Sequence, residues 1–266
     1  MAAPARVAIV TGGGSGIGAA IAARLAAGGT AVAIVGRRPD RLDAVATGIR
    51  SRGGGVLAIP DDMADGGAPR RIVESTLAAW GMIDVVVNDA AHIRNLTLEE
   101  IDEAEFDLHY RTNLRGPILL IREALPSLRA SGRGAIVNIS SSSASLSIPT
   151  QLMYASTKAG LEFATRLLAA ELAPAGIRVN AIAPGPIDTE IHLLWASDLE
   201  SARLALRDAV PLGHIGDPDD IAKWVDYLTR PDETFITGAV LPVDGGQTLN
   251  GWRSSIGDAA ASAAEG

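Results

Sequence analysis

The sequence predicts an α/β fold: one doubly wound parallel sheet of about seven strands, with helices on both faces. Short runs rich in valine and isoleucine recur along the chain, and longer alanine-rich segments separate them. Strands that are buried on both faces of a parallel sheet have this nearly continuous apolar character. We expect the strands at Val7–Val10, Ala31–Val35, Gly55–Ile59, Ile83–Val87, Ala135–Ile139, Arg178–Ile182 and Ala239–Pro242.

The segments between these strands have the length and composition of crossover helices, for example Ala19–Ala27, Arg41–Arg50 and Arg70–Trp80. Repeated strand–helix–strand order implies right-handed crossovers, which put helices on both faces of the sheet. No linker rich in proline and serine divides the chain. We therefore expect a single domain over residues 1–253 and a disordered tail over residues 254–266, which are small, polar and rich in alanine.

The composition of the 266-residue chain excludes several classes of function. A net charge of −8 and a pI of about 5.0 provide no basic field for nucleic acid or an anionic membrane surface. The chain has no cysteine, and its four histidines lack a metal-binding spacing, so we expect no disulfide, thiolate nucleophile or metal site. No apolar stretch approaches the roughly 18 residues of a transmembrane helix, and the N-terminal residues do not resemble a signal peptide. We expect a cytoplasmic protein with no membrane partner.

A glycine-rich turn follows the first predicted strand, in the sequence Thr-Gly-Gly-Gly-Ser-Gly-Ile-Gly, and a helical pattern comes next. This order presents free backbone N–H groups and the positive end of a helix to a phosphate. A flexible surface turn is the alternative, and a P-loop is disfavoured because no Gly-Lys-Ser/Thr follows. The context favours a Rossmann-type dinucleotide site in which Gly12 allows a tight turn, Gly16 the approach of a pyrophosphate, and Gly18 close helix–strand packing. The residues expected to bind the cofactor here are Gly12, Gly14, Ser15, Gly16, Ile17 and Gly18.

Two arginines, Arg37 and Arg38, follow the second predicted strand, where the adenosine ribose of a dinucleotide lies in such folds. An acidic residue at this point would bind the ribose 2′-hydroxyl, whereas arginine accommodates a 2′-phosphate. The sequence therefore favours NADP(H) over NAD(H), with a solvated charge pair as the alternative. After the third strand, Asp62, followed by Met63, would accept a hydrogen bond from the adenine amino group or cap a helix.

Tyr154 and Lys158 stand four residues apart in a segment with helical periodicity, which makes them neighbours on one helix face. A free tyrosine has a pKa of about 10, and a nearby ammonium group would lower it. Such tuning suits a general acid or base near neutral pH. By itself the pair is weak evidence, because this spacing is common on amphipathic helices.

Taken together, the motifs resemble those of the short-chain dehydrogenase/reductase family, over roughly Arg6 to Gln247. The resemblance rests on the Thr-Gly-x-x-x-Gly-x-Gly loop, the Tyr-x-x-x-Lys helix and a serine thirteen residues before the tyrosine. Four more matches occur in the family's order, at Asn88-Asp89-Ala90-Ala91, Asn113, Pro184-Gly185-Pro186-Ile187-Asp188-Thr189 and Val243-Asp244-Gly245-Gly246.

The resemblance implies a catalytic role for each of four residues. Tyr154 would exchange a proton with the substrate oxygen, and Lys158 would lower the Tyr154 pKa and bind the nicotinamide ribose. Ser141, rather than Ser140, would hold the substrate oxygen, and Asn113 would position a water that relays protons from Lys158. Further cofactor contacts are implied for Asn88 and Ala90 at the ribose and for Pro184, Gly185, Ile187 and Thr189 around the nicotinamide.

Two residues depart from the family pattern: Asp89 replaces an asparagine, and Ala91 replaces a glycine. Ala91 would be strained if the backbone there needs a positive φ. Asp89 would bring a like charge near phosphate, or would join a local hydrogen-bond cluster. We expect an altered loop and no loss of activity, because the four catalytic residues are present.

The segment after the Pro-Gly loop, residues 190–210, is expected to form a mobile lid over the substrate, with a surface helical hairpin as the alternative. Its apolar residues favour a small to medium, apolar or cyclic substrate. The expected substrate contacts are Ser143, Gln151, Pro186, Leu193 and Trp195, with His92 and Leu146 as weaker candidates. The family resemblance also implies a homotetramer that pairs helices Glu99–Ser131 and Leu152–Leu172, the first of them bent near Pro117 and Pro126.

The function that follows is an NAD(P)-dependent oxidoreductase that interconverts a ketone and a secondary alcohol, with Tyr154 as general acid/base. A catalytically silent dinucleotide-binding sensor is the alternative, although such a protein has no need of all four catalytic residues. A sugar-nucleotide epimerase with the same Tyr-x-x-x-Lys pair is disfavoured, since only about twenty residues follow Asp244-Gly245-Gly246.

Overall fold

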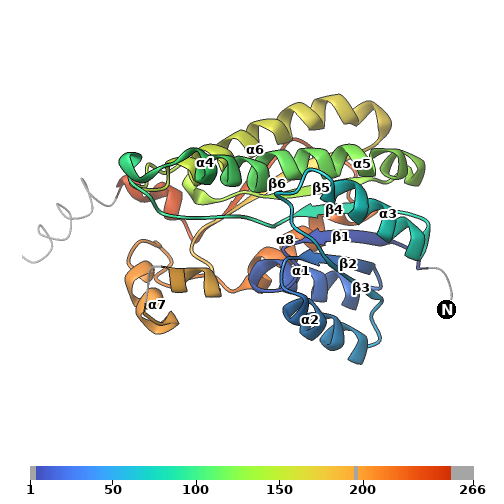
Figure 1. Cartoon of the computed structure of the whole chain (residues 1–266), viewed down its shortest axis with the longest axis horizontal. Helices are drawn as coiled ribbons and strands as arrows, with labels where there is room; N and C mark the ends of the chain where they lie inside the picture. The colour runs from blue at the N-terminus through green and yellow to red at the C-terminus, as the bar shows by residue number, and fades with distance from the viewer. Residues whose placement is uncertain (1–3, 195–196, 253–266) are drawn as a thin grey trace, which may run out of the picture.

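The computed structural model describes residues 4–194 and 197–252, and its centre is one parallel sheet in the order β3-β2-β1-β4-β5-β6-β7 (Figure 1). Every neighbouring pair of strands in it is parallel. The strands are β1 (Val7–Thr11), β2 (Ala31–Gly36), β3 (Val56–Pro60), β4 (Val85–Asn88), β5 (Ala135–Ile139), β6 (Arg178–Pro184) and β7 (Val240–Val243). The predicted doubly wound α/β fold is confirmed, and each predicted strand is found within two residues of its expected ends.

Helices cover both faces of the sheet. They are α1 (Gly16–Ala27), α2 (Pro39–Ser51), α3 (Ala68–Trp80), α4 (Glu103–Tyr110), α5 (Gly116–Ser131), α6 (Leu152–Leu172), α7 (Leu199–Arg207) and α8 (Pro218–Thr229). One apolar cluster joins the sheet to α1, α2 and α8, and a second joins the opposite face to α3, α5 and α6. Within the described residues, no helix combines the length and apolar character that crossing a membrane requires.

The continuous apolar runs of the central strands have a direct structural reason. Every residue of β1 and β4, and of β5 between β4 and β6, is buried, because helices pack on both sides of the sheet. At about 25 cal/mol per Å² of apolar surface removed from water, this two-sided burial is the main stabilising contribution to the sheet. Because all strands of the sheet run parallel, their carboxyl ends lie at one edge of the sheet. This edge carries the polar residues discussed below.

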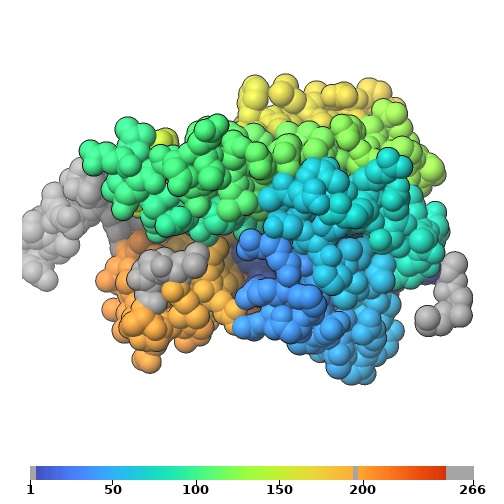
Figure 2. Space-filling model, viewed as in Figure 1, coloured from blue at the N-terminus to red at the C-terminus, as the bar shows by residue number. Residues whose placement is uncertain are grey.

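The chain changes direction in the sheet between β1 and β4, since β2 and β3 lie on one side of β1 and the later strands on the other. Ligands of open α/β sheets bind outside the carboxyl ends of the strands at such a switch point. Helix α7 lies beyond this edge, apart from the two helical layers (Figure 1). In the space-filling view a recess separates the orange segment around α7 from the blue N-terminal segments (Figure 2).

The structure corrects the prediction of one helix over Glu99–Ser131. A single turn of 3-10 helix at Leu98–Glu100 precedes α4, and a π-helical turn, Arg111–Arg115, separates α4 from α5. The interruption lies before both Pro117 and Pro126, the residues at which the sequence predicts bends. Pro117 lies in the first turn of α5, directly after the π-helical turn, and Pro126 lies inside α5.

Candidate active site

The four residues with expected catalytic roles come from three elements that meet at the carboxyl edge of the sheet. Ser141 is the second residue after the end of β5, and Tyr154 and Lys158 lie on α6. Asn113 lies in the π-helical turn between α4 and α5, which packs against α6. Such π-turns are uncommon and frequently occur at functional sites, because they let a buried side chain face inward out of helical phase.

The phenol of Tyr154 is buried and hydrogen-bonded to Ser141. Burial raises the pKa of Tyr154 to about 12; the Ser141 hydrogen bond opposes this rise, and the nearby Asp89 adds to it. Lys158 Nζ lies 5.6 Å from the centre of the Tyr154 ring. The pKa of Tyr154 is therefore raised in this structure and not lowered as expected, because burial disfavours the phenolate.

Lys158 is a long cationic side chain with only 2% exposure. Its Nζ donates a hydrogen bond of 2.7 Å to the carbonyl oxygen of Ile139, the last residue of β5. Burial lowers the pKa of Lys158, while the carboxylates of Asp89 and Glu162 oppose that lowering. A backbone carbonyl thus binds the amine, and the negative charges of Asp89 and Glu162 favour its protonated form.

The two serines after β5 have different surroundings. Ser140 is 3% exposed, and its Oγ donates to Glu162 Oε1 at 2.7 Å. Ser141 is more exposed, accepts a hydrogen bond from Ser143 N at 3.1 Å and reaches Tyr154. Ser140 therefore supports the interior around Glu162, and Ser141 is the serine that shares the site with Tyr154.

Asn113 is fully buried and holds the loop that follows β4. Its Oδ1 accepts from the backbone N–H of His92 at 2.7 Å, and its Nδ2 donates to the His92 carbonyl at 2.8 Å. The same Nδ2 lies 3.1 Å from Thr157 Oγ1 on α6. The amide group thereby connects the π-turn, the loop and α6, so that its position fixes the rear of the site.

The glycine loop has the backbone that phosphate binding requires. Gly12 and Gly16 adopt positive φ values of 74° and 51°. Ser15 is the N-cap residue of α1, but its side chain makes no capping hydrogen bond, so the positive helix end is open to an anion. Gly14 and Ile17 lie in the same loop and first turn, with Ile17 packed against the core.

Close approaches explain why glycine stands at positions 12 and 18. A Cβ on Gly12 would lie 2.9 Å from Ala90 N, and one on Gly18 would collide with the carbonyl oxygen of Gly12. Thr11 Oγ1 accepts from the backbone N–H groups of Asp89 and Ala90, both at 3.1 Å. The glycine loop and the turn after β4 are therefore packed against each other.

Asn88 and Ala91 complete that turn. Asn88 is 2% exposed; its Nδ2 donates to Asn138 Oδ1 at 2.8 Å, but its own Oδ1 is buried without a partner. An orphaned buried acceptor beside the glycine loop fits a missing donor of a bound dinucleotide. Among the described residues only Thr150 has a positive φ outside glycine, so the strain considered for Ala91 is absent.

The adenosine end is formed by exposed side chains. Arg37 and Arg38 are both exposed, and an Nη of Arg38 reaches Ser15 Oγ at 3.2 Å. Asp62 Oδ1 accepts from Ala64 N at 2.9 Å, and Met63 next to it is buried. The alternative of Asp62 as a helix cap is wrong, because α3 begins only at Ala68 with Gly67 as its N-cap.

The Pro-Gly loop begins with Pro184, the last residue of β6, and closes the opposite side of the site. A Cβ on Gly185 would lie 2.7 Å from Asp244 Cα, so only glycine allows this approach. Ile187 is 5% exposed and pairs with Gly216. The Thr189 methyl would lie 3.1 Å from a Cβ on Gly16, which places the Pro-Gly loop directly against the glycine loop.

The expected substrate residues are only partly brought together. Ser143 Oγ donates to Gln151 Oε1 at 2.8 Å, so these two side chains are partners. Leu193 is 48% exposed in the short helix after the Pro-Gly loop, near Pro186 in the chain but facing solvent. Trp195 lies outside the described residues.

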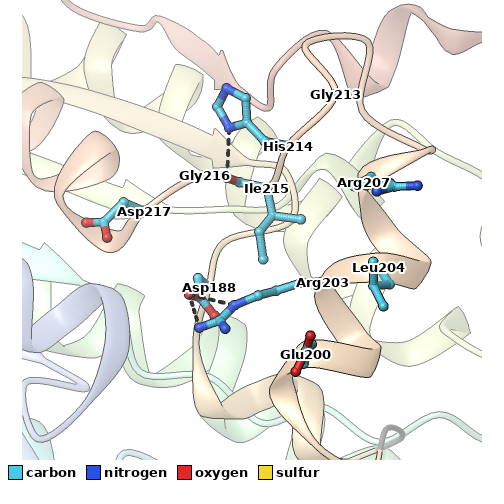
Figure 3. A pocket seen from close by; sticks show the side chains of 10 residues that line it. All are labelled: Asp188, Glu200, Arg203, Leu204, Arg207, Gly213, His214, Ile215, Gly216 and Asp217. Carbon is cyan, nitrogen blue, oxygen red and sulfur yellow. Dashed lines mark hydrogen bonds and ion pairs between the residues drawn. The ribbon is translucent and has the colours of Figure 1, made fainter.

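The segment expected to form a lid contains the short helix Glu190–Leu194 and α7. Arg203 on α7 forms an ion pair of 2.6 Å with Asp188, and Glu190 pairs with Arg41 on α2 at 3.2 Å (Figure 3 shows the first). A pocket of about 680 Å³ lies between α7 and residues 213–217. Its lining includes neither Tyr154 nor any other expected catalytic residue, so this pocket lies on the side of α7 away from the proposed catalytic residues.

A hydrogen-bonded cluster that the sequence did not predict lies beside Asn113. His92 Nε2 and Glu105 Oε1 are 2.5 Å apart, and His109 Nδ1 lies 2.9 Å from the Glu105 carbonyl. Burial opposes the charge on Glu105, but hydrogen bonds from His92 and Arg94 hold its pKa below the usual range. The backbone N–H of Arg94 points at His109 Nε2, so both ring nitrogens of His109 are engaged within the protein. The only sequence signal was the four-residue spacing of Glu105 and His109, which is too common to be diagnostic.

Comparison with known proteins agrees with this geometry. A family profile described as "Enoyl-(Acyl carrier protein) reductase" matches residues 12–248. The chain is 38% identical over 244 residues to "(2S)-[(R)-hydroxy(phenyl)methyl]succinyl-CoA dehydrogenase subunit BbsD" of Thauera aromatica, an alignment that covers 92% of this chain and 97% of the relative.

Two solved structures of similar proteins contain a nicotinamide dinucleotide. A blue fluorescent protein from a metagenomic library, in complex with NADPH, has a TM-score of 0.85 and 35% identity, covering 92% of this chain and 98% of that one. The 3-ketoacyl-(acyl-carrier-protein) reductase of Brucella melitensis, complexed with NADH, has a TM-score of 0.83 and 33% identity, covering 92% and 99%. With the profile match over most of its length and these relatives, the chain belongs to the short-chain dehydrogenase/reductase family of oxidoreductases, which has an NAD(P)-binding fold.

Proposed function

We propose that this protein interconverts a ketone and a secondary alcohol with NADP(H), and that Tyr154 is its general acid/base. The observation that carries the proposal is the buried phenol of Tyr154, hydrogen-bonded to Ser141, with Lys158 Nζ 5.6 Å from its ring and Asp89 nearby. We also propose that residues 1–253 act as one catalytic domain, with residues 190–210 as a substrate lid.

Each residue of the site has a distinct task in this proposal. When bound, the nicotinamide supplies or accepts the hydride. In reduction, Tyr154 donates its proton to the substrate oxygen, which Ser141 Oγ holds by a hydrogen bond. Lys158 binds the nicotinamide ribose and passes protons to Tyr154 from a water that Asn113 positions.

The cofactor contacts are proposed along the same edge. The glycine loop holds the pyrophosphate at the open end of α1, and Asp62 binds the adenine. Asn88 and Ala90 lie at the nicotinamide ribose, and the Pro-Gly loop orients the carboxamide through Ile187 and Thr189. The preference for NADP(H) rests on Arg37 and Arg38, of which Arg38 reaches into the glycine loop.

The proposed substrate is small to medium in size and apolar or cyclic. The name of the Thauera relative describes a hydroxyl-bearing carbon attached to a phenyl ring, which is the apolar, cyclic part of a larger CoA thioester. Leu193 and Leu204 are apolar side chains of the lid segment. Ser143 and Gln151, already hydrogen-bonded to each other, would form the polar wall of this pocket.

Replacing Tyr154 by phenylalanine should lower kcat by at least about a hundredfold in both directions, because the proton donor and acceptor is lost. Turnover of an apolar ketone and alcohol panel with NADPH and NADP measures this effect. Tyr227→Phe, on the exposed face of α8, is the matched control and should retain full activity. Undiminished activity of Tyr154→Phe would contradict the proposed chemistry, and dinucleotide binding by the wild type without any turnover would support a sensor.

The raised pKa of Tyr154 predicts that the two directions differ in pH dependence. Reduction uses the protonated phenol, which persists at neutral pH, whereas oxidation uses the phenolate, whose fraction rises with pH. Between about pH 6 and pH 9, kcat/KM for alcohol oxidation should rise by up to about tenfold per pH unit, while that for ketone reduction should not rise. Parallel profiles for the two directions would count against this assignment.

Substitution of Arg37 or Arg38 by alanine should raise the Kd for NADPH by about tenfold or more, through loss of charged hydrogen bonds to the 2′-phosphate. The Kd for NADH should change by less than about twofold in the same variants. Arg50→Ala, at the far end of α2, is the control. Fluorescence titration provides the measurement, and an unchanged Kd for NADPH would refute the 2′-phosphate site.

We further propose a homotetramer. Large apolar side chains are exposed on the helices expected to pair, among them Ile118 on α5 and Phe163 and Leu167 on α6. Covering such a surface favours association. Light scattering coupled to size-exclusion chromatography should give the mass of four chains at micromolar concentration, and a monomer there would contradict the proposal.

A further inference from the structure

The carboxyl group of Asp89 lies underneath the glycine loop, between that loop and the catalytic lysine. Its Oδ2 is 2.8 Å from the point that a Cβ on Gly12 would occupy and 2.6 Å from the corresponding point at Gly18. The backbone N–H of Gly18, in the first turn of α1, donates to the carboxyl. Asp89 therefore occupies the inner side of the same helix end whose outer side is open to a phosphate.

The charged and titratable surroundings of Asp89 are few. On the α6 side, Lys158 attracts its negative charge, and Tyr154 is close enough for the two groups to interact. On the α1 side, the backbone N–H of Gly18 donates to the carboxyl. The loop after β4 carries His92, which is bonded to Glu105. Burial is the dominant effect and raises the pKa of Asp89 to about 7, with Lys158 and the Gly18 N–H opposing the rise.

A dinucleotide on the glycine loop would place a second anion at this helix end. The positive end of one helix carries about half an elementary charge, which stabilises one anion better than two. A phosphate above the loop would therefore make the charged form of Asp89 less favourable and its neutral form more favourable.

We propose that Asp89 takes up a proton from solvent when the dinucleotide binds, so that cofactor affinity falls as the pH rises through neutrality. This inference rests on the proposed function, since it needs a dinucleotide phosphate on the glycine loop. Binding favours protonated Asp89, so the complex holds more protons than the free protein. By linkage the affinity is highest below neutral pH and declines until Asp89 is ionised in both states. Asparagine, the residue that the family pattern has here, would make the affinity independent of this proton.

Isothermal titration calorimetry with NADPH as the probe tests the proposal. Titrations near pH 7.5 in phosphate and in Tris buffer, which differ in ionisation enthalpy, measure the number of protons taken up. The 2′-phosphate of NADPH also titrates, at about pH 6, so the readout is the difference between wild type and Asp89→Asn. We expect the wild type to take up about half a proton more than Asp89→Asn. Between about pH 6.5 and pH 8.5, its Kd should rise at least about threefold more than that of the variant.

Lys158 is the other group near the glycine loop that could take up a proton when NADPH binds. The variant Lys158→Met distinguishes uptake by Lys158 from uptake by Asp89. Proton uptake that stays at the wild-type level in Lys158→Met and falls in Asp89→Asn supports the proposal. Uptake that falls in Lys158→Met and stays at the wild-type level in Asp89→Asn overturns it, as does equal uptake in wild type and Asp89→Asn. If Asp89→Asn does not fold, Asp89→Ser provides the same comparison with a smaller neutral side chain. Absence of NADPH binding by the wild type at any pH would instead contradict the proposed function itself.

Discussion

The burial of the Lys158 ammonium group is the constraint on which the rest of the site depends. An isolated charge in a protein interior is unfavourable by several kcal/mol unless it is hydrogen-bonded and paired. Here the carbonyl of Ile139 accepts from the amine, and the charges of Asp89 and Glu162 act on it electrostatically. These groups come from the ends of β5 and β4 and from α6, so three elements together determine the environment of one cation.

The consequences of this arrangement extend to the neighbouring residues. Glu162 is itself buried and needs Ser140 as a donor, which leaves Ser141 to face Tyr154. Asp89, which follows β4, is attracted by the charge of Lys158. Its packing under the glycine loop requires glycine at positions 12 and 18. The backbone of the glycine loop and the polar interior of the site are therefore packed directly against each other. A methyl group at Gly12 or Gly18 would displace the carboxyl group of Asp89.

Asn113 illustrates how a single side chain is reoriented by its helix. Within an unbroken helix from residue 99 to residue 131, it would follow a regular helical phase, but the π-turn at Arg111–Arg115 shifts that phase. The Asn113 amide then accepts a hydrogen bond from the backbone N–H of His92 and donates one to the His92 carbonyl. The sequence predicts bends near Pro117 and Pro126, whereas the change of helical phase lies just before Pro117. The spacing of apolar residues along the chain did not predict a π-turn.

The sequence by itself determined the strands, the glycine loop and the Tyr154–Lys158 pair, because these depend on local patterns: continuous apolar runs, glycine spacing and a four-residue helical repeat. The distinction between Ser141 and its neighbour was implied by the family resemblance. Only the tertiary structure decided the raised pKa of Tyr154, the place of Asp89 beneath the glycine loop and the cluster of His92 with Glu105 and His109. Burial and electrostatic fields arise from segments far apart in the chain, so no local pattern encodes them.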